Sequence, residues 1–76
     1  MIRNSYAIEQ RMRFIDFLAN RYGKINRSAL TDYFGISIVQ ASKDFGVYTR
    51  HAPGNLVYDP REKCYLAQEG FKRVYR

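Results

Sequence analysis

The chain has 76 residues, enough for one small domain, and its 46% hydrophobic content argues against disorder throughout. Thirteen Lys and Arg residues against seven Asp and Glu give a formal net charge of +6, which favours a polyanionic partner over a role in solubility alone. The single Cys64 excludes an internal disulfide, and no apolar run is long enough to cross a bilayer. We therefore expect a cytoplasmic protein without a metal or cofactor.

The first predicted element is a helix over residues 5–22, which Gly23 ends in the left-handed conformation common after helices. Phe14, Phe17 and Leu18 lie outside its main apolar face. Either two elements cover this helix, or part of it is a contact surface. The residues of the main face recur at spacings of four, three, four and three positions: Ile8, Met12, Ile15, Ala19 and Tyr22.

Two shorter helices follow, and each begins with a capping residue. Asn26 is predicted to cap the second helix, which ends at Gly35. Ile36 then forms an apolar pivot between the helices. Ser37 is predicted to cap the third helix, and its spacing from Gln40 is that of a capping box. On the third helix the face predicted to be buried holds Ile38, Ala41, Phe45 and Tyr48, and the opposite face holds Val39, Gln40 and Lys43.

Short β-prone runs make up the next part of the chain. Residues 56–59 and 64–67 are separated by residues 60–63, which is the spacing of a hairpin. The turn residues before them predict a loop over residues 51–55. The closing residues 68–76 are predicted to be helical because three apolar residues have helical spacing: Phe71, Val74 and Tyr75.

The joint between the second and third helices is the central functional signal. A helix-turn-helix needs a left-handed residue in a tight turn, an apolar plug, a small residue where the helices cross and an apolar anchor one turn later. Gly35, Ile36, Ala41 and Phe45 supply these features in that order. We therefore predict a mainly α fold with a small β-hairpin. It is a winged helix-turn-helix of three core helices and a two-stranded wing, formed as a single domain over residues 1–76.

Such a fold places the third helix in the major groove of double-stranded DNA. Gln40 can pair bidentately with adenine, Lys43 can reach guanine acceptors and Val39 can touch a thymine methyl group. Phosphate contacts are expected where helices begin and at the basic tip of the wing. The residues expected to make them are Arg27, Ser28, Ser37, Arg61 and Lys63.

Four segments carry a family resemblance: Gly23–Leu30, Tyr33–Ser37, Gln40–Phe45 and Ala52–Asp59. Together they resemble the N-terminal winged helix-turn-helix of WYL-domain transcriptional regulators, and in particular repressors associated with bacterial anti-phage defence. The similarity covers roughly residues 11–67. It implies a homodimeric repressor, bacterial or from a phage, bound to an inverted repeat. By position it points to a DNA-facing set of Arg27, Ser28, Ser37, Gln40, Ser42 and Lys43.

Members of that family carry a WYL domain, thought to sense a nucleic-acid or nucleotide ligand, after the winged helix. This chain is either a fragment of a longer regulator or a freestanding relative, and its sequence leaves both open. A second function class is a winged-helix adaptor that binds protein through the apolar surface of the first helix. Salt-sensitive affinity for random duplex DNA would distinguish a DNA binder from an adaptor. An enzyme is not expected, because the sequence has no cluster of catalytic residue types.

A symmetric dimer is the expected assembly, because one winged helix covers only one half-site. The first helix, the tail or both would meet across the two-fold axis, with the third helices about 34 Å apart. The alternative is a monomer whose tail folds back on the domain. The apolar residues proposed for the interface are Phe14, Phe17, Phe71, Val74 and Tyr75.

Overall fold

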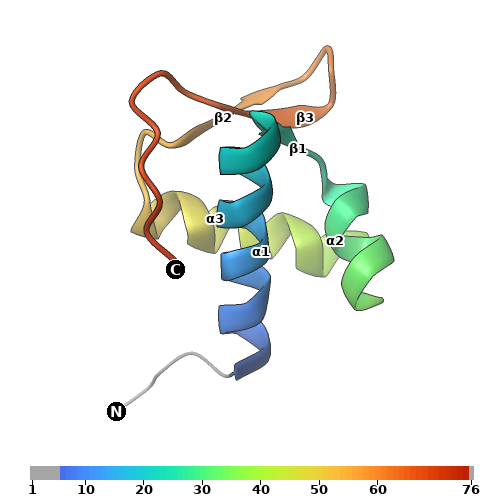
Figure 1. The fold of residues 1–76 in the computed structure, drawn as a ribbon. Coiled ribbons are helices and arrows are strands. Elements are labelled where there is room, and N and C mark those ends of the chain that lie inside the picture. Colours follow the sequence, from blue (N-terminus) through green and yellow to red (C-terminus); the bar gives the residue numbers. More distant parts are fainter. Residues whose placement is uncertain (1–5, 76) are drawn as a thin grey trace.

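Three helices come first along the chain, as the capping and spacing signals predict. They are α1 (Tyr6–Tyr22), α2 (Arg27–Phe34) and α3 (Ile38–His51). The computed structural model describes residues 6–75, so residue 5 of the predicted first helix and residue 76 of the tail lie outside it. Helix α1 crosses in front of α3, and α2 lies to one side (Figure 1). The three helices therefore form the predicted helical core.

Side chains and glycines determine where the helices begin and end. Asn26 is the N-cap of α2, and its Oδ1 accepts a hydrogen bond from the Ala29 N–H at 3.0 Å. Ser37 caps α3 in the same way, with its Oγ 3.0 Å from the Gln40 nitrogen. Gly35 ends α2 at φ 69°, a left-handed conformation that glycine adopts without steric cost. The predicted turn chemistry between α2 and α3 is confirmed.

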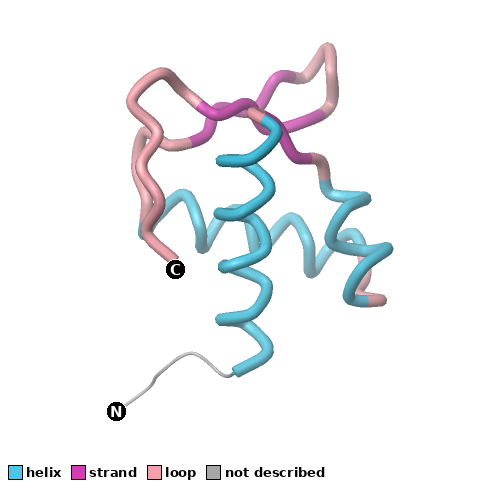
Figure 2. The backbone as a smooth tube through the Cα atoms, in the orientation of Figure 1, coloured by secondary structure: helices cyan, strands magenta, loops and turns pink. Residues whose placement is uncertain are grey.

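A three-stranded antiparallel sheet lies at the C-terminal end of α1 (Figure 2). The predicted hairpin is confirmed: β2 (Leu56–Asp59) pairs with β3 (Cys64–Ala67), with Leu56 opposite Ala67. A further strand, β1 (Lys24–Ile25), pairs with the other edge of β3, giving the order β1-β3-β2. No sequence pattern predicts β1, because two residues are too few to show the alternation of a strand. The hairpin is thus attached to the helices through β1.

The core contains side chains from the three helices and the sheet. Ala41 and Phe45 are 0% and 1% exposed, as the helix-turn-helix pattern predicts. Two predictions for the apolar faces are wrong, since Tyr22 is 66% exposed and Ile38 is 52% exposed. Each is a terminal residue of its helix, beyond the turns that pack against the core. The most deeply buried apolar side chains besides Ala41 and Phe45 are Met12, Ile15, Ala19, Leu30 and Tyr48.

The tail after β3 is not helical, so the prediction for residues 68–76 is wrong over its described part. The tail instead runs back beside α1 (Figure 1). The backbone N–H groups of Val74 and Tyr75 donate to the Asp16 carboxylate at 3.1 to 3.3 Å, and Arg73 Nε donates to it at 2.9 Å. Because this carboxylate takes both N–H groups, they do not enter the hydrogen-bond ladder of a helix.

Asp16 is the centre of a buried polar network that holds the tail. Its side chain is fully buried, and the Tyr48 hydroxyl donates to it at 2.6 Å. The same hydroxyl accepts a hydrogen bond from the Asn55 side chain at 3.1 Å, and Asn55 also bonds the backbone of Lys72 at 2.8 and 3.2 Å. Burial raises the pKa of Tyr48, and the hydrogen bond to Asp16 raises it further. The hydroxyl therefore stays protonated and keeps its role as donor.

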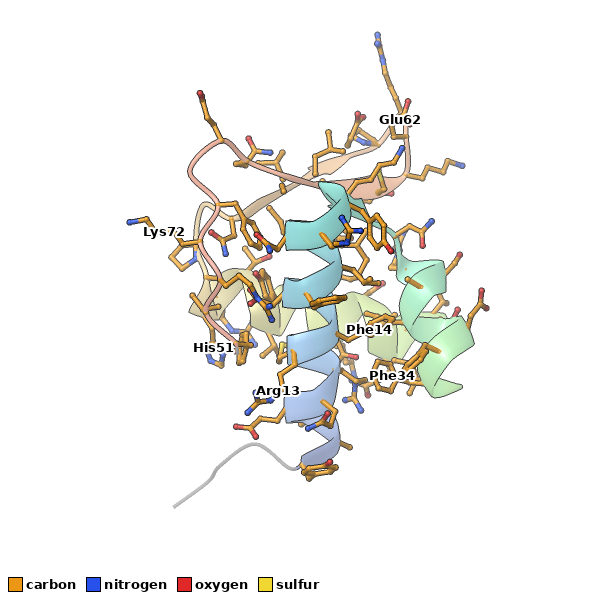
Figure 3. All side chains as sticks on the ribbon, viewed as in Figure 1. Arg13, Phe14, Phe34, His51, Glu62 and Lys72 are labelled. Atoms are coloured by element: carbon orange, nitrogen blue, oxygen red, sulfur yellow. The ribbon has the colours of Figure 1, made fainter. Side chains whose placement is uncertain are left out.

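The end of α3 also contacts the tail. His51, which the sequence pattern placed in a loop, is the last residue of α3. Its Nδ1 lies 2.7 Å from the Tyr75 hydroxyl, at the side of the domain where the tail passes (Figure 3). Phe71 and Tyr75 are partly buried against the core. Apolar contacts therefore hold the tail at Phe71 and Tyr75, and a hydrogen bond to the end of α3 also holds it at Tyr75.

Candidate nucleic-acid interface

The outward face of α3 carries residues predicted to read DNA bases. Val39 is 61% exposed, and Lys43 is exposed one helical turn later. Ile38, expected in the core, adds a second exposed apolar side chain at the start of the helix. Ser37, the cap of α3, is exposed as well. Apolar groups beside a cation match what the major groove offers, namely thymine methyl groups and guanine acceptors.

Gln40 is placed differently from Val39 and Lys43, because its side chain is tied to a buried carboxylate. Its Nε2 donates to Asp44 Oδ1 at 3.0 Å, and Asp44 is only 2% exposed. Arg11 from α1 donates to the same carboxylate through Nε at 2.6 Å and Nη2 at 3.2 Å. Asp44 and Arg11 therefore form an ion pair between α3 and α1. The expected capping box is only half formed, since the Gln40 side chain turns to Asp44 instead of back to Ser37.

Arg27, expected to bind phosphate, also joins three parts of the domain. Its Nη1 donates to Ser42 Oγ on α3 at 2.9 Å. Its Nη2 lies 3.4 Å from the Tyr58 hydroxyl on β2, and the guanidinium lies 5.7 Å from the centre of the Tyr58 ring. A guanidinium has five N–H donors, so these bonds leave others for an anion. Ser28, the next residue of α2, is exposed.

The turn of the wing exposes the two cations predicted at its tip, Arg61 and Lys63. Asp59 shapes this turn, because its Oδ1 accepts from the Arg61 N–H at 2.9 Å and its backbone oxygen accepts from the Lys63 N–H at 2.7 Å. Lys63 takes a left-handed conformation, with φ 56°. Glu62 lies between the cations, at the outer end of the hairpin (Figure 3). Arg61, Glu62 and Lys63 together therefore carry a net charge of +1.

Stacked rings connect the wing to α3. The ring of Tyr65 on β3 stacks on Phe45 of α3, with centroids 4.0 Å apart and planes 5° apart. The ring of Tyr58 on β2 packs against the same Tyr65 ring, with centroids 4.8 Å apart. Burial raises the pKa of Tyr65, while the charge of Arg27 opposes this increase. The wing and the third helix therefore form one packed unit.

Three residues of this surface were missed by the sequence analysis. Arg50 is exposed in the last turn of α3, and its spacing of seven from Lys43 is a signal that could have found it. Arg11 and Tyr58, the partners of Asp44 and Arg27, lie on other elements. No local spacing relates them to α3, so only the folded chain shows their roles.

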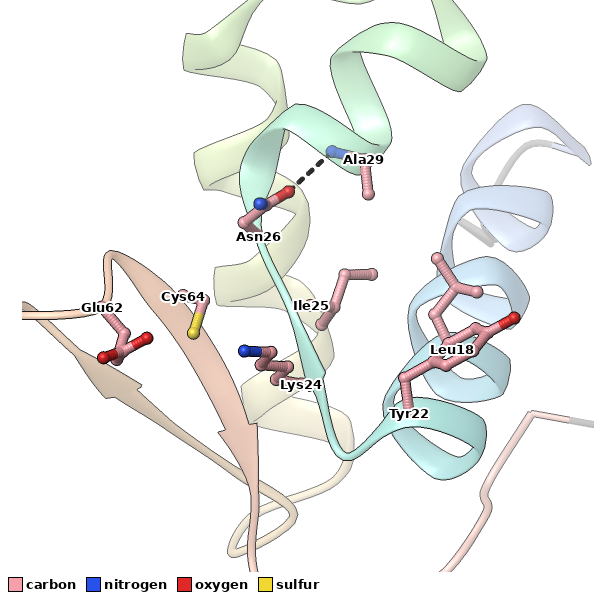
Figure 4. Close-up of a pocket in the computed structure, with 8 residues that line it drawn as sticks. All are labelled: Leu18, Tyr22, Lys24, Ile25, Asn26, Ala29, Glu62 and Cys64. Atoms are coloured by element: carbon pink, nitrogen blue, oxygen red, sulfur yellow. Dashed lines mark hydrogen bonds between the residues drawn. The ribbon is translucent and has the colours of Figure 1, made fainter.

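An apolar hollow of about 430 Å³ opens between α1, the start of α2 and the wing (Figure 4). Of its polar side chains, Asn26 already caps α2, and Lys24 and Glu62 come from β1 and the wing turn. Residues 6–75 contain no group of three or more His, Cys, Asp or Glu that could hold a metal ion. No helix in this described range is long and apolar enough to cross a membrane.

The residues proposed for a dimer interface divide into two sets. Phe14 is covered within the chain, because it stacks on Tyr33 at 4.6 Å and meets the edge of Phe34 at 5.1 Å (Figure 3). Phe17 and Val74 are each 49% exposed. Phe71 and Tyr75, by contrast, pack against the core. The fold-back of the tail expected for the monomer alternative is therefore present, but it leaves part of the proposed surface uncovered.

Comparison with known proteins gives a consistent result. The family described as the BrxR transcriptional regulator winged helix-turn-helix domain matches residues 7–76. A DNA-binding transcriptional repressor CapW of Pseudomonas aeruginosa is 51% identical over 67 residues, or 88% of this chain. CapW proteins of Escherichia coli (strain KTE188) and Stenotrophomonas maltophilia are 49% and 48% identical over 88% and 86% of the chain. The chain spans 22% of the length of each of these relatives.

Proposed function

The chain belongs to the BrxR transcriptional regulator family of winged helix-turn-helix domains, and we propose that it binds double-stranded DNA for a transcriptional repressor. The supporting observation is the two-sided character of α3. Val39 and Lys43 are exposed on one side, while Ala41 and Phe45 are buried on the other. A helix anchored in this way can enter the major groove without disturbing the core. Acting on bacterial genes, such a repressor would work in the cytoplasm.

The contacts divide by their chemistry. Val39, Gln40 and Lys43 are assigned to base edges, where apolar, amide and ammonium groups distinguish the base pairs. In the free domain, the hydrogen bond to Asp44 restrains Gln40 and uses one N–H of its amide. The other N–H and the carbonyl oxygen of that amide are the groups we assign to adenine. The residues assigned to phosphates are Arg27, Ser28, Ser37, Ser42, Arg61 and Lys63.

Selection of duplexes from a random pool tests the function. The recovered duplex should bind more tightly than a random duplex. Both affinities should fall as the salt concentration rises from about 50 to about 200 mM. Lys43→Ala should change the preferred base and cost about 1–3 kcal/mol on the selected duplex. Arg61→Ala should weaken both duplexes equally and reduce the salt slope by about 0.9.

Lys72→Ala is the matched control, because it removes one exposed cation from the tail. It should leave base preference unchanged. If it altered preference as much as Lys43→Ala, the assignment of the α3 face would be wrong. If the parent chain bound no duplex at any salt concentration, the proposal of DNA binding would fail in favour of a protein-binding adaptor.

We further propose that the domain acts as a homodimer on an inverted repeat. The exposed aromatic and aliphatic side chains of Phe17 and Val74 support this, because apolar surface left uncovered by one chain is suited to a second copy. The Arg73 guanidinium lies 5.6 Å from the centre of the Phe17 ring, so a cation borders the patch. Phe14, Phe71 and Tyr75 would support this surface from beneath.

Sedimentation at micromolar protein tests the dimer. The parent chain should sediment faster than its 9.0 kDa mass predicts, and Phe17→Glu should restore the monomer because the interface would have to bury a charged carboxylate in place of an apolar ring. Tyr22→Glu is the control, since Tyr22 is also exposed on α1 but lies five residues after Phe17, about 140° away around the helix. A 9.0 kDa species in both parent and variant would refute this interface.

A further inference from the structure

Gly46 lies in the middle of α3, where glycine weakens a helix. Alanine is more favourable than glycine at such a position, because glycine loses more backbone freedom on folding. The backbone does not need glycine here. The glycines with positive φ are Gly23, Gly35 and Gly54, and Gly46 is not among them. Its presence therefore has no explanation in the conformation of the helix.

Packing within the domain does not require glycine at this position either. A Cβ added to Gly46 would meet no atom within 4 Å outside its own helical surroundings. Ala41 shows the contrasting case, because it is fully buried on the side of α3 that faces the core. An alanine at position 46 would thus fit the free domain. Nothing among residues 6–75 therefore requires glycine at this position.

The neighbours of Gly46 on α3 indicate which kind of partner could come close to this position. Val39, Lys43, Gly46 and Arg50 follow one another at spacings of four, three and four, so they share one face of α3. Lys43 and Arg50 are exposed and lie about 10 Å apart along the helix axis, with Gly46 between them. Two cations with a gap between them suit a polyanion that passes close to the helix backbone.

We propose that Gly46 is the point where bound double-stranded DNA comes closest to α3, near enough to exclude a Cβ atom, and that Arg50 binds a phosphate beside it. This inference rests on the proposed DNA-binding function and adds two residues to its surface. The missing side chain lets the helix enter the groove more deeply. That depth brings Val39 and Lys43 within reach of the base edges. Arg50 then extends the phosphate contacts to the end of the helix.

Substitution at position 46 separates this role from a structural one. If glycine were needed for the fold, Gly46→Ala would lower the Tm, whereas the proposed role predicts a higher Tm and a weaker affinity for DNA. Gly46→Ala should raise the Tm by a few degrees, since alanine favours the helix. The same variant should lose at least tenfold in affinity for the duplex recovered by selection, measured by fluorescence anisotropy. Gly46→Gln, with a longer side chain that is also compatible with a helix, should lose more. Arg50→Ala should weaken selected and random duplexes alike and reduce the salt slope.

Asn20→Ala is the matched control for helix stability. Asn20 is exposed on α1, and alanine there should also raise the Tm while leaving affinity within twofold of the parent. If Gly46→Ala and Gly46→Gln bound the selected duplex with the affinity of the parent, the close approach would be refuted while DNA binding stood. If the parent itself bound no duplex, the proposed function would fail and this inference with it.

Discussion

Removal of one buried hydroxyl, by Tyr48→Phe, should destabilise the domain strongly. The ring remains, so no large cavity forms, but Asp16 loses a donor at 2.6 Å and the Asn55 amide loses an acceptor at 3.1 Å. Tyr48 is fully buried, so water does not replace the hydroxyl. A hydrogen bond to a charged group contributes about 1.5–3 kcal/mol, and we expect a loss in that range.

This loss is large for a chain of 76 residues. Domains of this size have an unfolding free energy of about 4–11 kcal/mol, so the loss of one hydroxyl would remove between about one seventh and about three quarters of it. Each kcal/mol corresponds to about 4–8 °C in Tm for so small a domain. The Tm of Tyr48→Phe should therefore fall by about 6–24 °C.

Thermal and urea unfolding, followed by circular dichroism at the helix band, measure this effect. Tyr33→Phe is the matched control, because Tyr33 is 71% exposed and the substitution keeps the ring that stacks on Phe14. It should change stability by less than about 0.5 kcal/mol. A Tyr48→Phe variant as stable as the parent would refute the reasoning that Asp16 depends on this donor. An unchanged m-value would confirm that the native fold is kept.

Two further predictions follow from the same structure. Burial raises the pKa of Tyr48, so the unfolded chain releases this proton near pH 10 while the folded chain retains it. The stabilisation from Tyr48 should therefore be complete below about pH 10, and the free energy of unfolding should decrease above it. Urea unfolding between about pH 8 and 11 should show this decrease, and Tyr48→Phe should make it shallower; equal slopes in parent and variant would contradict the assignment. Gly35→Ala should lower stability by about 1 kcal/mol because Gly35 has φ 69°, whereas Gly70→Ala, at an open position without positive φ, should change it little in the same unfolding experiment.

The sequence was sufficient for features that depend on near neighbours. Asn26 and Ser37 each accept a hydrogen bond from a backbone N–H three residues later, and the N–H of Gly35 donates to the Thr31 carbonyl oxygen four residues earlier. The hairpin strands likewise pair across a short turn. Local sterics and local hydrogen bonds therefore determined where α2 begins and ends, where α3 begins, and the hairpin of the wing.

Local signals were also enough to nominate the exposed side of α3. The helical period relates Val39 to Lys43, and it extends to Arg50, which the sequence analysis could have included. The period could not show that Gln40 is tied to Asp44 or that Arg27 reaches Tyr58. Those contacts depend on how α1, α3 and the wing pack together.

The tail shows most clearly what only the tertiary structure decided. Its apolar spacing predicts a helix, yet Val74 and Tyr75 donate their N–H groups to Asp16, more than fifty residues earlier in the chain. A buried carboxylate needs several donors, and the tail supplies three of them, counting Arg73. The free energy of satisfying that buried charge outweighs a weak local preference for helix. A spacing pattern within the tail contains no information about a charge that far away, so the fold of the whole domain had to decide its course.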